Sequence, residues 1–215
     1  MSHPIRTEHM TGLVLAGGRG ARMGGIDKGL ASFRGVPLAL HALRRLAPQV
    51  GTVAVNANRH LADYASFGVP VWPDASADHA GPLAGLMAGL QHCATAWLLT
   101  VPCDTPLFPH DLAVRLADAM ASRDADVAIA SAPEIQPDGT SVMQPQPVFC
   151  LLRAALRPSL QQFLASGGRK VGSWTSQQRC VEVPFSREGD APDAFFNANT
   201  VAELQSLQAT PQALP

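Results

Sequence analysis

The chain contains 215 residues, of which 47% are hydrophobic and 15% are charged, and its formal net charge is −1. This composition predicts a packed globular protein with one sizeable domain rather than a disordered chain. The chain has no broad basic excess and no apolar run of roughly 20 residues, so it is not expected to bind nucleic acid or to span a membrane.

Strand and helix patterns alternate along the first 131 residues. Apolar runs rich in Val, Ile and Leu predict strands at residues 11–16, 52–58, 69–72, 96–104 and 126–131. Between them, segments with a proline near the start predict helices at residues 37–47, 81–94 and 109–121. This alternation predicts a three-layer α/β fold with a mostly parallel, doubly wound sheet.

The rest of the chain follows a different pattern. Residues 133–147 are rich in Pro and Gln and are predicted to form a long surface loop. After this loop come an apolar run at 148–152, a helix over 153–166, a strand around 180–185 and a closing segment at 195–207. We expect a single domain over residues 11–208, with flexible ends at residues 1–10 and 209–215.

The four cysteines lie far apart and form no CxxC pair; they are Cys93, Cys103, Cys150 and Cys180. This spacing predicts reduced thiols rather than disulfides or a zinc site. The first ten residues also lack the apolar core of a signal peptide, so we expect a cytoplasmic protein. Cys103 is expected to be a small buried residue rather than a nucleophile.

Residues 15–30, LAGGRGARMGGIDKGL, contain six glycines. Glycine-dense turns let the backbone approach a ligand closely and present N–H groups to anions, so this segment predicts a phosphate-binding loop. The P-loop pattern GxxxxGK[ST] fails, because Lys28 follows Asp27 and precedes Gly29. The dinucleotide fingerprint GxGxxG fails at Met23, where glycine is required.

Three polar residues, Asn56, Asp74 and Asp104, fall at the ends of predicted strands, as does the start of the glycine loop. In a doubly wound sheet, ligands bind beyond the carboxyl ends of the strands, so these residues predict one site. Asp104 is the best candidate for a Mg²⁺ ligand, with a cap for the following helix as the alternative. Asn56 and Asp74 fit turns equally well when they are considered alone.

The glycine loop resembles the nucleotidyltransferase motif LAxGxGxRMG followed by a lysine. Over nearly its whole length the chain is similar to the molybdenum cofactor guanylyltransferase family, in the blocks LAGGRGARMGGIDKGL, VPCDTPLFP, QPVFCLL, GGRKVGSW and FFNANT. The resemblance implies a Rossmann-like nucleotidyltransferase fold. It also implies transfer of GMP from GTP to molybdenum-molybdopterin, with Mg²⁺ as cofactor and pyrophosphate as leaving group. Molybdoenzyme-specific chaperones or cofactor-insertion proteins are expected as further partners, although the sequence does not define which.

The resemblance also implies roles for individual residues. Backbone N–H groups of the glycine loop would bind phosphate, while basic side chains neutralise charge on the leaving pyrophosphate. The expected nucleotide-binding residues are Leu15, Ala16, Gly17, Gly18, Lys28, Asn56, Asp74 and Asp104. The expected catalytic residues are Arg22, Lys28 and Asp104, with Asp104 as the metal ligand. Within this set, Asn56 and Asp74 are expected to contact guanine or ribose.

The second substrate is expected to contact the later blocks, through Arg169, Lys170, Asn197 and Asn199. Arg169 and Lys170 have a structural alternative, because basic residues after a helix interact favourably with its dipole. The two asparagines, two residues apart, would face one side of an extended segment, or would cap the helix that follows.

Two other functions stay open from the sequence alone. The cytidylyltransferase of the same pathway usually has LAAG in place of LAGG and lacks the DKGL ending, so residues 15–30 favour the guanylyl enzyme. A protein that binds nucleotide or cofactor without catalysis is the other alternative. The presence of both Lys28 and Asp104 argues against it, because neutral residues would suffice for shape.

Overall fold

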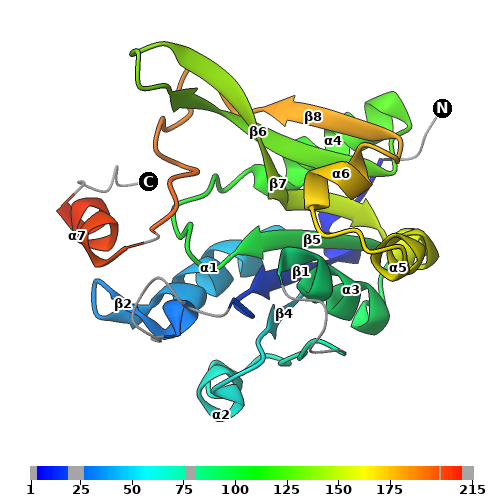
Figure 1. The fold of residues 1–215 in the computed structure, drawn as a ribbon, viewed down its shortest axis with the longest axis horizontal. Helices are drawn as coiled ribbons and strands as arrows, with labels where there is room; N and C mark the ends of the chain where they lie inside the picture. Colours follow the sequence, from blue (N-terminus) through cyan, green and yellow to red (C-terminus); the bar gives the residue numbers. More distant parts are fainter. Residues whose placement is uncertain (1–3, 19–26, 76–80, 199, 210–215) are drawn as a thin grey trace.

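The computed structural model describes residues 4–18, 27–75, 81–198 and 200–209 (Figure 1). Within these ranges, one six-stranded sheet has the strand order β4-β1-β5-β7-β6-β8. Its strands are β1 (Met10–Leu15), β4 (Thr52–Asn56), β5 (Trp97–Pro102), β6 (Val127–Ile135), β7 (Ser141–Arg153) and β8 (Cys180–Pro184). All of them run in the same direction except β7, which is antiparallel to β5 and to β6. The prediction of a mostly parallel sheet is therefore confirmed.

Helices cover both faces of the sheet. On one face lie α1 (Leu38–Leu46) and α4 (Leu112–Arg123), and on the other lie α3 (Pro82–His92) and α5 (Arg157–Ala165). Alternate residues of β1 point to the two faces, because side chains alternate along a strand. Met10 and Val14 pack with the first pair of helices, while Leu13 packs with the second pair. The three-layer, doubly wound architecture is thus confirmed.

The predicted strand at residues 69–72 is wrong as a separate element. A single parallel bridge joins Val55 to Val71 there, with the Val55 N–H donating to Pro70 O and the Trp72 N–H donating to Val55 O. Pro70 lacks an N–H group and Pro73 follows immediately, so the pairing cannot be extended. This segment nevertheless lies along the outer edge of β4.

The predicted surface loop at residues 133–147 is also wrong, because these residues form the outer part of a β6–β7 hairpin. The turn closes through the Gln136 N–H, which donates to Thr140 O, and the Gly139 N–H, which donates to Gln136 O; Gly139 has a φ of 82° that favours glycine. Pro133 and Pro145 lie where each strand pairs on one side, a position in which a missing N–H group is tolerated. Proline content therefore indicated an edge of the sheet here rather than a loop.

Pairing between β6 and β7 contains a bulge. The register jumps from Ile129–Cys150 to Ala130–Gln146, so residues 147–149 bulge out of the ladder. The Thr100 hydroxyl of β5 donates to Val148 O at 2.7 Å and anchors the bulge to the centre of the sheet. Bulges of this kind redirect side chains next to functional sites.

Smaller elements complete the described chain. They are β2 (Ser32–Phe33), β3 (Val36–Pro37), α2 (Leu61–Ala65), α6 (Val171–Thr175), α7 (Val201–Ala209) and the 3₁₀ turns Thr7–His9, Lys28–Leu30, Ala47–Gln49 and Ala154–Leu156. Residues 7–10, expected with the flexible N-terminus, instead belong to the fold, because the Gly51 N–H donates to Thr7 O and Met10 begins β1. No helix in the described ranges is long and apolar enough to cross a membrane.

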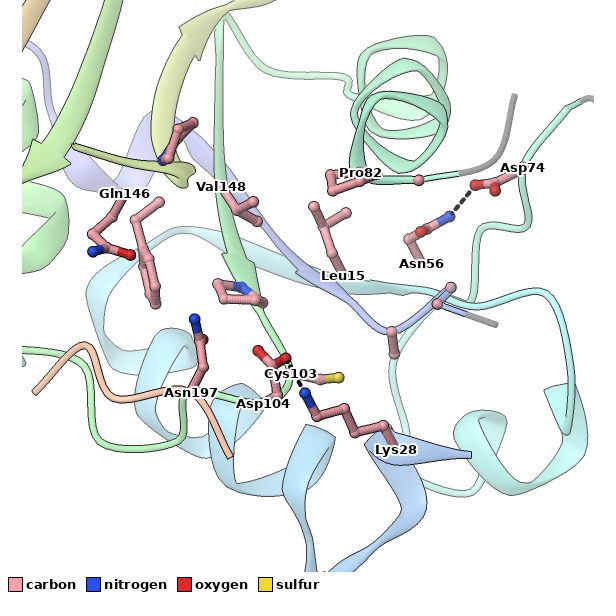
Figure 2. A pocket seen from close by; sticks show the side chains of 17 residues that line it. Leu15, Lys28, Asn56, Asp74, Pro82, Cys103, Asp104, Gln146, Val148 and Asn197 are labelled. Carbon is pink, nitrogen blue, oxygen red and sulfur yellow. Dashed lines mark hydrogen bonds and ion pairs between the residues drawn. The ribbon is translucent and has the colours of Figure 1, made fainter. Parts of the chain in front are cut away.

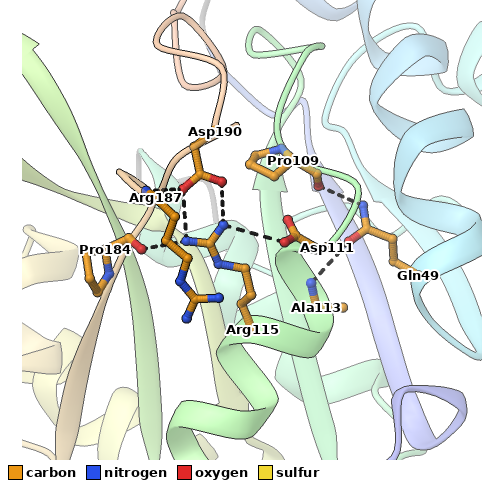
Figure 3. Close-up of polar contacts among 8 residues, drawn as sticks. All are labelled: Gln49, Pro109, Asp111, Ala113, Arg115, Pro184, Arg187 and Asp190. Carbon is orange, nitrogen blue, oxygen red and sulfur yellow. Dashed lines mark hydrogen bonds and ion pairs between the residues drawn. The ribbon is translucent and has the colours of Figure 1, made fainter. Parts of the chain in front are cut away.

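After β8 the chain returns across α4, and a buried arginine fixes this return (Figure 3). Arg115 of α4 donates to both Asp190 carboxylate oxygens, at 2.7 and 3.1 Å, and to Pro184 O at 2.6 Å. Its guanidinium lies 3.8 Å from the centre of the Phe185 ring. Beside it, Gln49 accepts from the Ala113 N–H at the start of α4. These contacts bring Asn197 back to the carboxyl-terminal edge of β5.

Candidate active site

A cavity of about 380 Å³ opens at the carboxyl ends of β1, β4 and β5 (Figure 2). Nine of the residues that the sequence analysis selected line it: Leu15, Ala16, Gly17, Gly18, Lys28, Asn56, Asp74, Asp104 and Asn197. The structure therefore brings together residues that are up to 182 positions apart (197 − 15) in the chain. Two selected residues, Arg22 and Asn199, lie outside the described residues.

The start of the glycine loop is fixed to neighbouring strands by backbone bonds. The Ala16 N–H donates to Asn56 O at 2.8 Å, and the Cys103 N–H donates to Leu15 O at 3.1 Å. At Gly17, a Cβ atom would lie 2.9 Å from both Asn56 Oδ1 and Asn58 Nδ2. Glycine is required at this position because two polar side chains approach the backbone closely.

Asp74 is held by two asparagines. Its Oδ1 accepts from Asn56 Nδ2 and its Oδ2 accepts from Asn58 Nδ2, both at 2.8 Å. Asn58 Oδ1 in turn accepts from the Asp74 N–H, and Asn58 Nδ2 also lies 3.4 Å from Gly17 O. Asn56 is buried and donates a further bond to Trp72 O. The carboxylate of Asp74 is therefore fixed in orientation at the edge of the cavity.

Lys28 and Asp104 form an ion pair in the same cavity. Lys28 Nζ lies 2.5 Å from Asp104 Oδ2, and each side chain is about 20% exposed. Asp104 is held from behind by the Ala198 N–H, which donates to its carbonyl oxygen. Helix α4 begins at Leu112, with Asp111 at the N-cap position, so Asp104 does not cap that helix. A cation and a carboxylate are thus both accessible at the end of β5.

Cys103 lines the cavity but is buried, and this burial raises the pKa of its thiol. The nearby Asp104 carboxylate raises the pKa further. A protonated, buried thiol is a poor nucleophile. This geometry agrees with the expectation of a small packing residue.

The cavity has two sides. One, here called the parallel-strand side, consists of residues 15–18 with Lys28, Asn56, Asp74 and Asp104. The other, the β7 side, consists of residues 146–149 in the bulge together with Asn197. Figure 2 shows Gln146 and Asn197 at one end, Asn56 and Asp74 at the other, and the Lys28–Asp104 pair between them.

Sequence reasoning missed two polar residues of the site. Asn58 is two positions after Asn56, and that spacing in NAN was the available signal. Gln146 lies in the QPVFCLL block, but residues 133–147 were predicted to form a surface loop, so no position near the site could be assigned to it. Asn197 was predicted, and its Oδ1 accepts a bond from the Thr105 hydroxyl beside Asp104.

Arg169 and Lys170 are not among the residues that line the cavity. Arg169 lies after α5 and donates to Gly168 O at 2.8 Å, with Leu164 O at 3.5 Å. Lys170 is exposed at the start of α6. The contacts of Arg169 agree with the alternative in which this residue interacts with the end of a helix, while no such contact is found for Lys170 among the described residues.

The described residues contain no cluster of three or more His, Cys, Asp or Glu side chains that would hold a metal alone. Asp104 nevertheless fits a Mg²⁺ site, since this ion usually takes one or two carboxylates together with phosphate oxygens and waters. The partly exposed Asp104 carboxylate faces a cavity large enough to admit the phosphates. The chemistry of the site is therefore compatible with a metal that arrives with a nucleotide.

The fold is shared with solved structures. "Molybdopterin-guanine dinucleotide biosynthesis protein A" from Archaeoglobus fulgidus matches with a TM-score of 0.72 at 21% sequence identity, over 93% of this chain and 97% of that chain. A glycine turn, a lysine and a carboxylate lie together at the carboxyl ends of the parallel strands, which is where ligands bind in this class of fold and an arrangement suited to phosphoryl transfer.

Comparison with known sequences identifies the family to which the chain belongs. The model of the "MobA-like NTP transferase domain" matches residues 12–181, and the chain belongs to this family. The relative named "Molybdenum cofactor guanylyltransferase" from Acidovorax sp. (strain JS42) is 63% identical over 205 residues, 95% of this chain and 97% of the relative. The relative of the same name from Acidovorax ebreus (strain TPSY) is 62% identical over the same shares. These findings confirm the resemblance inferred from the motifs. Nucleotidyltransferases of this family typically use a divalent metal.

Proposed function

We propose that the enzyme transfers GMP from GTP to molybdenum-molybdopterin, with Mg²⁺ as cofactor, and produces the guanine dinucleotide form of the cofactor and pyrophosphate. The observation that carries this proposal is the position of the Lys28–Asp104 pair between two differently built sides of one cavity (Figure 2). The relatives of the same name support it. A cytoplasmic location and delivery of the product to a molybdoenzyme-specific chaperone or cofactor-insertion protein also belong to the proposal.

The parallel-strand side suits GTP. Guanine presents two adjacent donors, N1–H and the exocyclic amine, and a carboxylate can accept both. Asp74 has its carboxylate oriented by Asn56 and Asn58, so it is preorganised for such a pair. The N–H groups of Gly17 and Gly18 are then available for phosphate at the start of the glycine loop.

The reaction replaces one phosphoanhydride bond with another. An acceptor phosphate oxygen attacks the α-phosphorus of GTP, and the bond from that phosphorus to the bridging oxygen of pyrophosphate breaks. Because the developing charge lies on phosphate oxygens, catalysis depends on positioning and on charge neutralisation. Lys28 would stabilise the leaving pyrophosphate, and Arg22, which lies outside the described residues, is proposed to assist it. Bound at Asp104, Mg²⁺ would supply further positive charge.

The β7 side is proposed to bind the acceptor. Gln146 and Asn197 offer amide donors and acceptors at the end of the cavity opposite Asn56. Asn199, also outside the described residues, is kept in this assignment because it is two residues from Asn197. Contact with Arg169 or Lys170 would require the acceptor to extend beyond the cavity, so we give these two residues a minor role.

Nucleotide selectivity in turnover tests the proposal. Purified protein with Mg²⁺ and a source of molybdopterin is expected to release pyrophosphate from GTP, and not from CTP or ATP. Asp104→Asn, which replaces the proposed metal-binding carboxylate, should abolish turnover. The matched change of an exposed aspartate of α4, Asp118→Asn, should preserve turnover.

Each result has a defined meaning. A preference for CTP would keep the mechanism and overturn the base assignment. Turnover that persists in Asp104→Asn would remove Asp104 from the mechanism. GTP binding without turnover would show that the site holds a ligand without transferring it.

A further inference from the structure

A buried carboxylate lies directly beside the catalytic lysine. Asp27 precedes Lys28 and is only 6% exposed, although its side chain is polar. Its Oδ1 accepts two bonds, from the Gly29 N–H at 3.1 Å and from the Tyr64 hydroxyl at 2.6 Å. The bond from Gly29 caps the 3₁₀ turn Lys28–Leu30, from which the lysine side chain extends toward Asp104. The Asp27 carboxylate therefore connects the turn that carries Lys28 to the Tyr64 hydroxyl.

Tyr64 comes from an outlying element. Helix α2 lies beyond β4 at the edge of the molecule (Figure 1), and among its five residues Tyr64 is the buried one. Its side chain is fully buried, while the neighbours Asp63 and Ala65 are exposed. The helix thus contributes one side chain to the interior, and the polar end of this side chain reaches the lysine turn.

The Tyr64 hydroxyl contacts the turn closely. A Cβ atom at Gly29 would lie 2.3 Å from the hydroxyl oxygen and 3.2 Å from Ala16 Cβ. Glycine at position 29 therefore gives the hydroxyl access to Asp27 between the lysine turn and the glycine loop. The Tyr64 ring packs edge-on against Phe67, with ring centres 5.7 Å apart.

The hydroxyl also stays a donor. Burial raises the pKa of Tyr64 far above its ordinary value, and the bond to Asp27 raises it further. A buried carboxylate that loses such a donor is strongly destabilised, because hydrogen bonds to charged groups are worth more than neutral ones. Without this bond, the Asp27 carboxylate that caps the turn carrying Lys28 would lose its connection to α2.

We propose that Tyr64 and Asp27 are positioning residues that hold the Lys28 ammonium against Asp104, where the phosphates of the nucleotide bind. This inference rests on the role proposed above for Lys28. It assigns a function in the active site to α2, an element that contributes no residue to the cavity lining among the described residues.

A double-mutant cycle tests this positioning. Tyr64→Phe removes the hydroxyl and keeps the ring, so kcat should fall by about tenfold while the KM for GTP changes by less than about twofold. In a Lys28→Met background the same change should have almost no further effect on kcat, because the group it positions is gone. Phe67→Leu, which disturbs packing on the same ring, should lower the Tm without this kcat effect.

Two variants of Asp27 give an independent readout. Asp27→Asn keeps an oxygen acceptor for both donors, whereas Asp27→Ala removes it. The alanine variant should reproduce the loss seen in Tyr64→Phe, and the asparagine variant should recover at least half of it on a logarithmic scale. Equal loss in both Asp27 variants, or a Tyr64→Phe effect that is fully additive with Lys28→Met, would overturn the proposal.

Failure of this proposal is distinct from failure of the proposed function. The cycle uses whichever nucleotide triphosphate the wild-type enzyme turns over, so an error in base preference does not affect it. If no nucleotide is turned over, calorimetric binding of inorganic pyrophosphate replaces kcat in the same cycle. Coupling between Tyr64 and Lys28 in pyrophosphate affinity would then support the inference, and additivity would overturn it.

Discussion

The two sides of the cavity are fixed in different ways. On the parallel-strand side, polar groups bond to one another within the site: Asn56 and Asn58 hold Asp74, and Lys28 pairs with Asp104. On the β7 side, the residues are carried by a strand bulge and by a long return of the chain. That return is fixed by Arg115 and Asp190, neither of which lines the cavity.

This difference predicts how substitutions on each side affect catalysis and stability. Substitutions on the parallel-strand side should change catalysis directly, because the groups proposed to contact the nucleotide also hold each other. The β7 side should respond in two separate ways, through the residues that face the cavity and through distant contacts that stabilise the fold. The following predictions test this separation, in order of decreasing effect.

Lys28→Met should have the largest effect, a loss in kcat of about 10²- to 10³-fold, because the charge proposed to stabilise the leaving pyrophosphate is removed. The chain has one other lysine, and Lys170→Met is therefore the matched control. That variant should stay within about twofold of wild type, since Lys170 is exposed and does not line the cavity. Steady-state pyrophosphate release measures both. Equal losses would place Lys170 in the active site.

Asp190→Ala should lower the free energy of unfolding by about 2–3 kcal/mol, because Arg115 is buried and loses a bidentate partner. Urea denaturation measures this loss, with the exposed Glu188→Ala as control. The KM for GTP should stay unchanged, because the parallel-strand side is fixed locally. A clear increase in the KM for GTP in Asp190→Ala would contradict the separation of the two sides.

The same pair predicts a pH dependence. Hydrogen bonds from Arg115 hold the pKa of Asp190 below its ordinary value in the folded protein. The stabilisation is therefore complete above the ordinary aspartate pKa and is lost as the pH falls through the lower, folded-state value. Urea titrations should show a constant difference between wild type and Asp190→Ala from pH 5 to 8, which narrows below about pH 4. A difference that grows at low pH would refute this sign.

Asn58→Ala should raise the KM for GTP by about tenfold with little change in kcat, because Asp74 loses two of the bonds that orient it. The ratio of kcat/KM for GTP to that for CTP should fall by a similar factor. Competition between the two nucleotides in one reaction measures this ratio. An unchanged ratio would remove Asp74 from base recognition.

Gln146→Leu should raise the KM for the acceptor by about fivefold and leave the KM for GTP unchanged, since one polar contact is lost. Gln144→Leu is the matched control, because Gln144 lies two residues earlier on β7 and does not line the cavity. Arg169→Ala should behave like this control. If Arg169→Ala weakened acceptor binding more than Gln146→Leu, the acceptor would extend beyond the cavity toward α5.

Much of the fold was accessible from the sequence, because buried parallel strands read as continuous apolar runs. The runs that form β1, β4 and β5 were recognised on this basis. The hairpin at residues 133–147 was not, since its prolines favour a loop unless the pairing of each strand on one side is known. The antiparallel direction of β7 likewise depends on contacts with β5 that no local pattern encodes.

Within the site, residues inside contiguous motifs were predictable and residues that depend on three-dimensional contact were not. Lys28 and Asp104 occur in distinctive motifs, and the structure places them 2.5 Å apart. Gln146 reaches the cavity through a bulge, a shift in register that has no reliable local signal. Tyr64 lies in a short, mostly exposed helix, and its link to Asp27 spans 37 positions.

The reversed strand β7 has a consequence for how such enzymes diversify. It enters the sheet at the edge where β1, β4 and β5 leave it, and its turn at residues 136–140 lies several paired residues away from the cavity. Because side chains alternate, adding or removing two residues in each arm of the hairpin preserves which ones face inward. Insertions at this turn could therefore lengthen the wall against an incoming acceptor while the lysine and the carboxylate stay in place. Changes in the hairpin would therefore alter which acceptor fits the cavity and leave the transfer reaction itself unchanged.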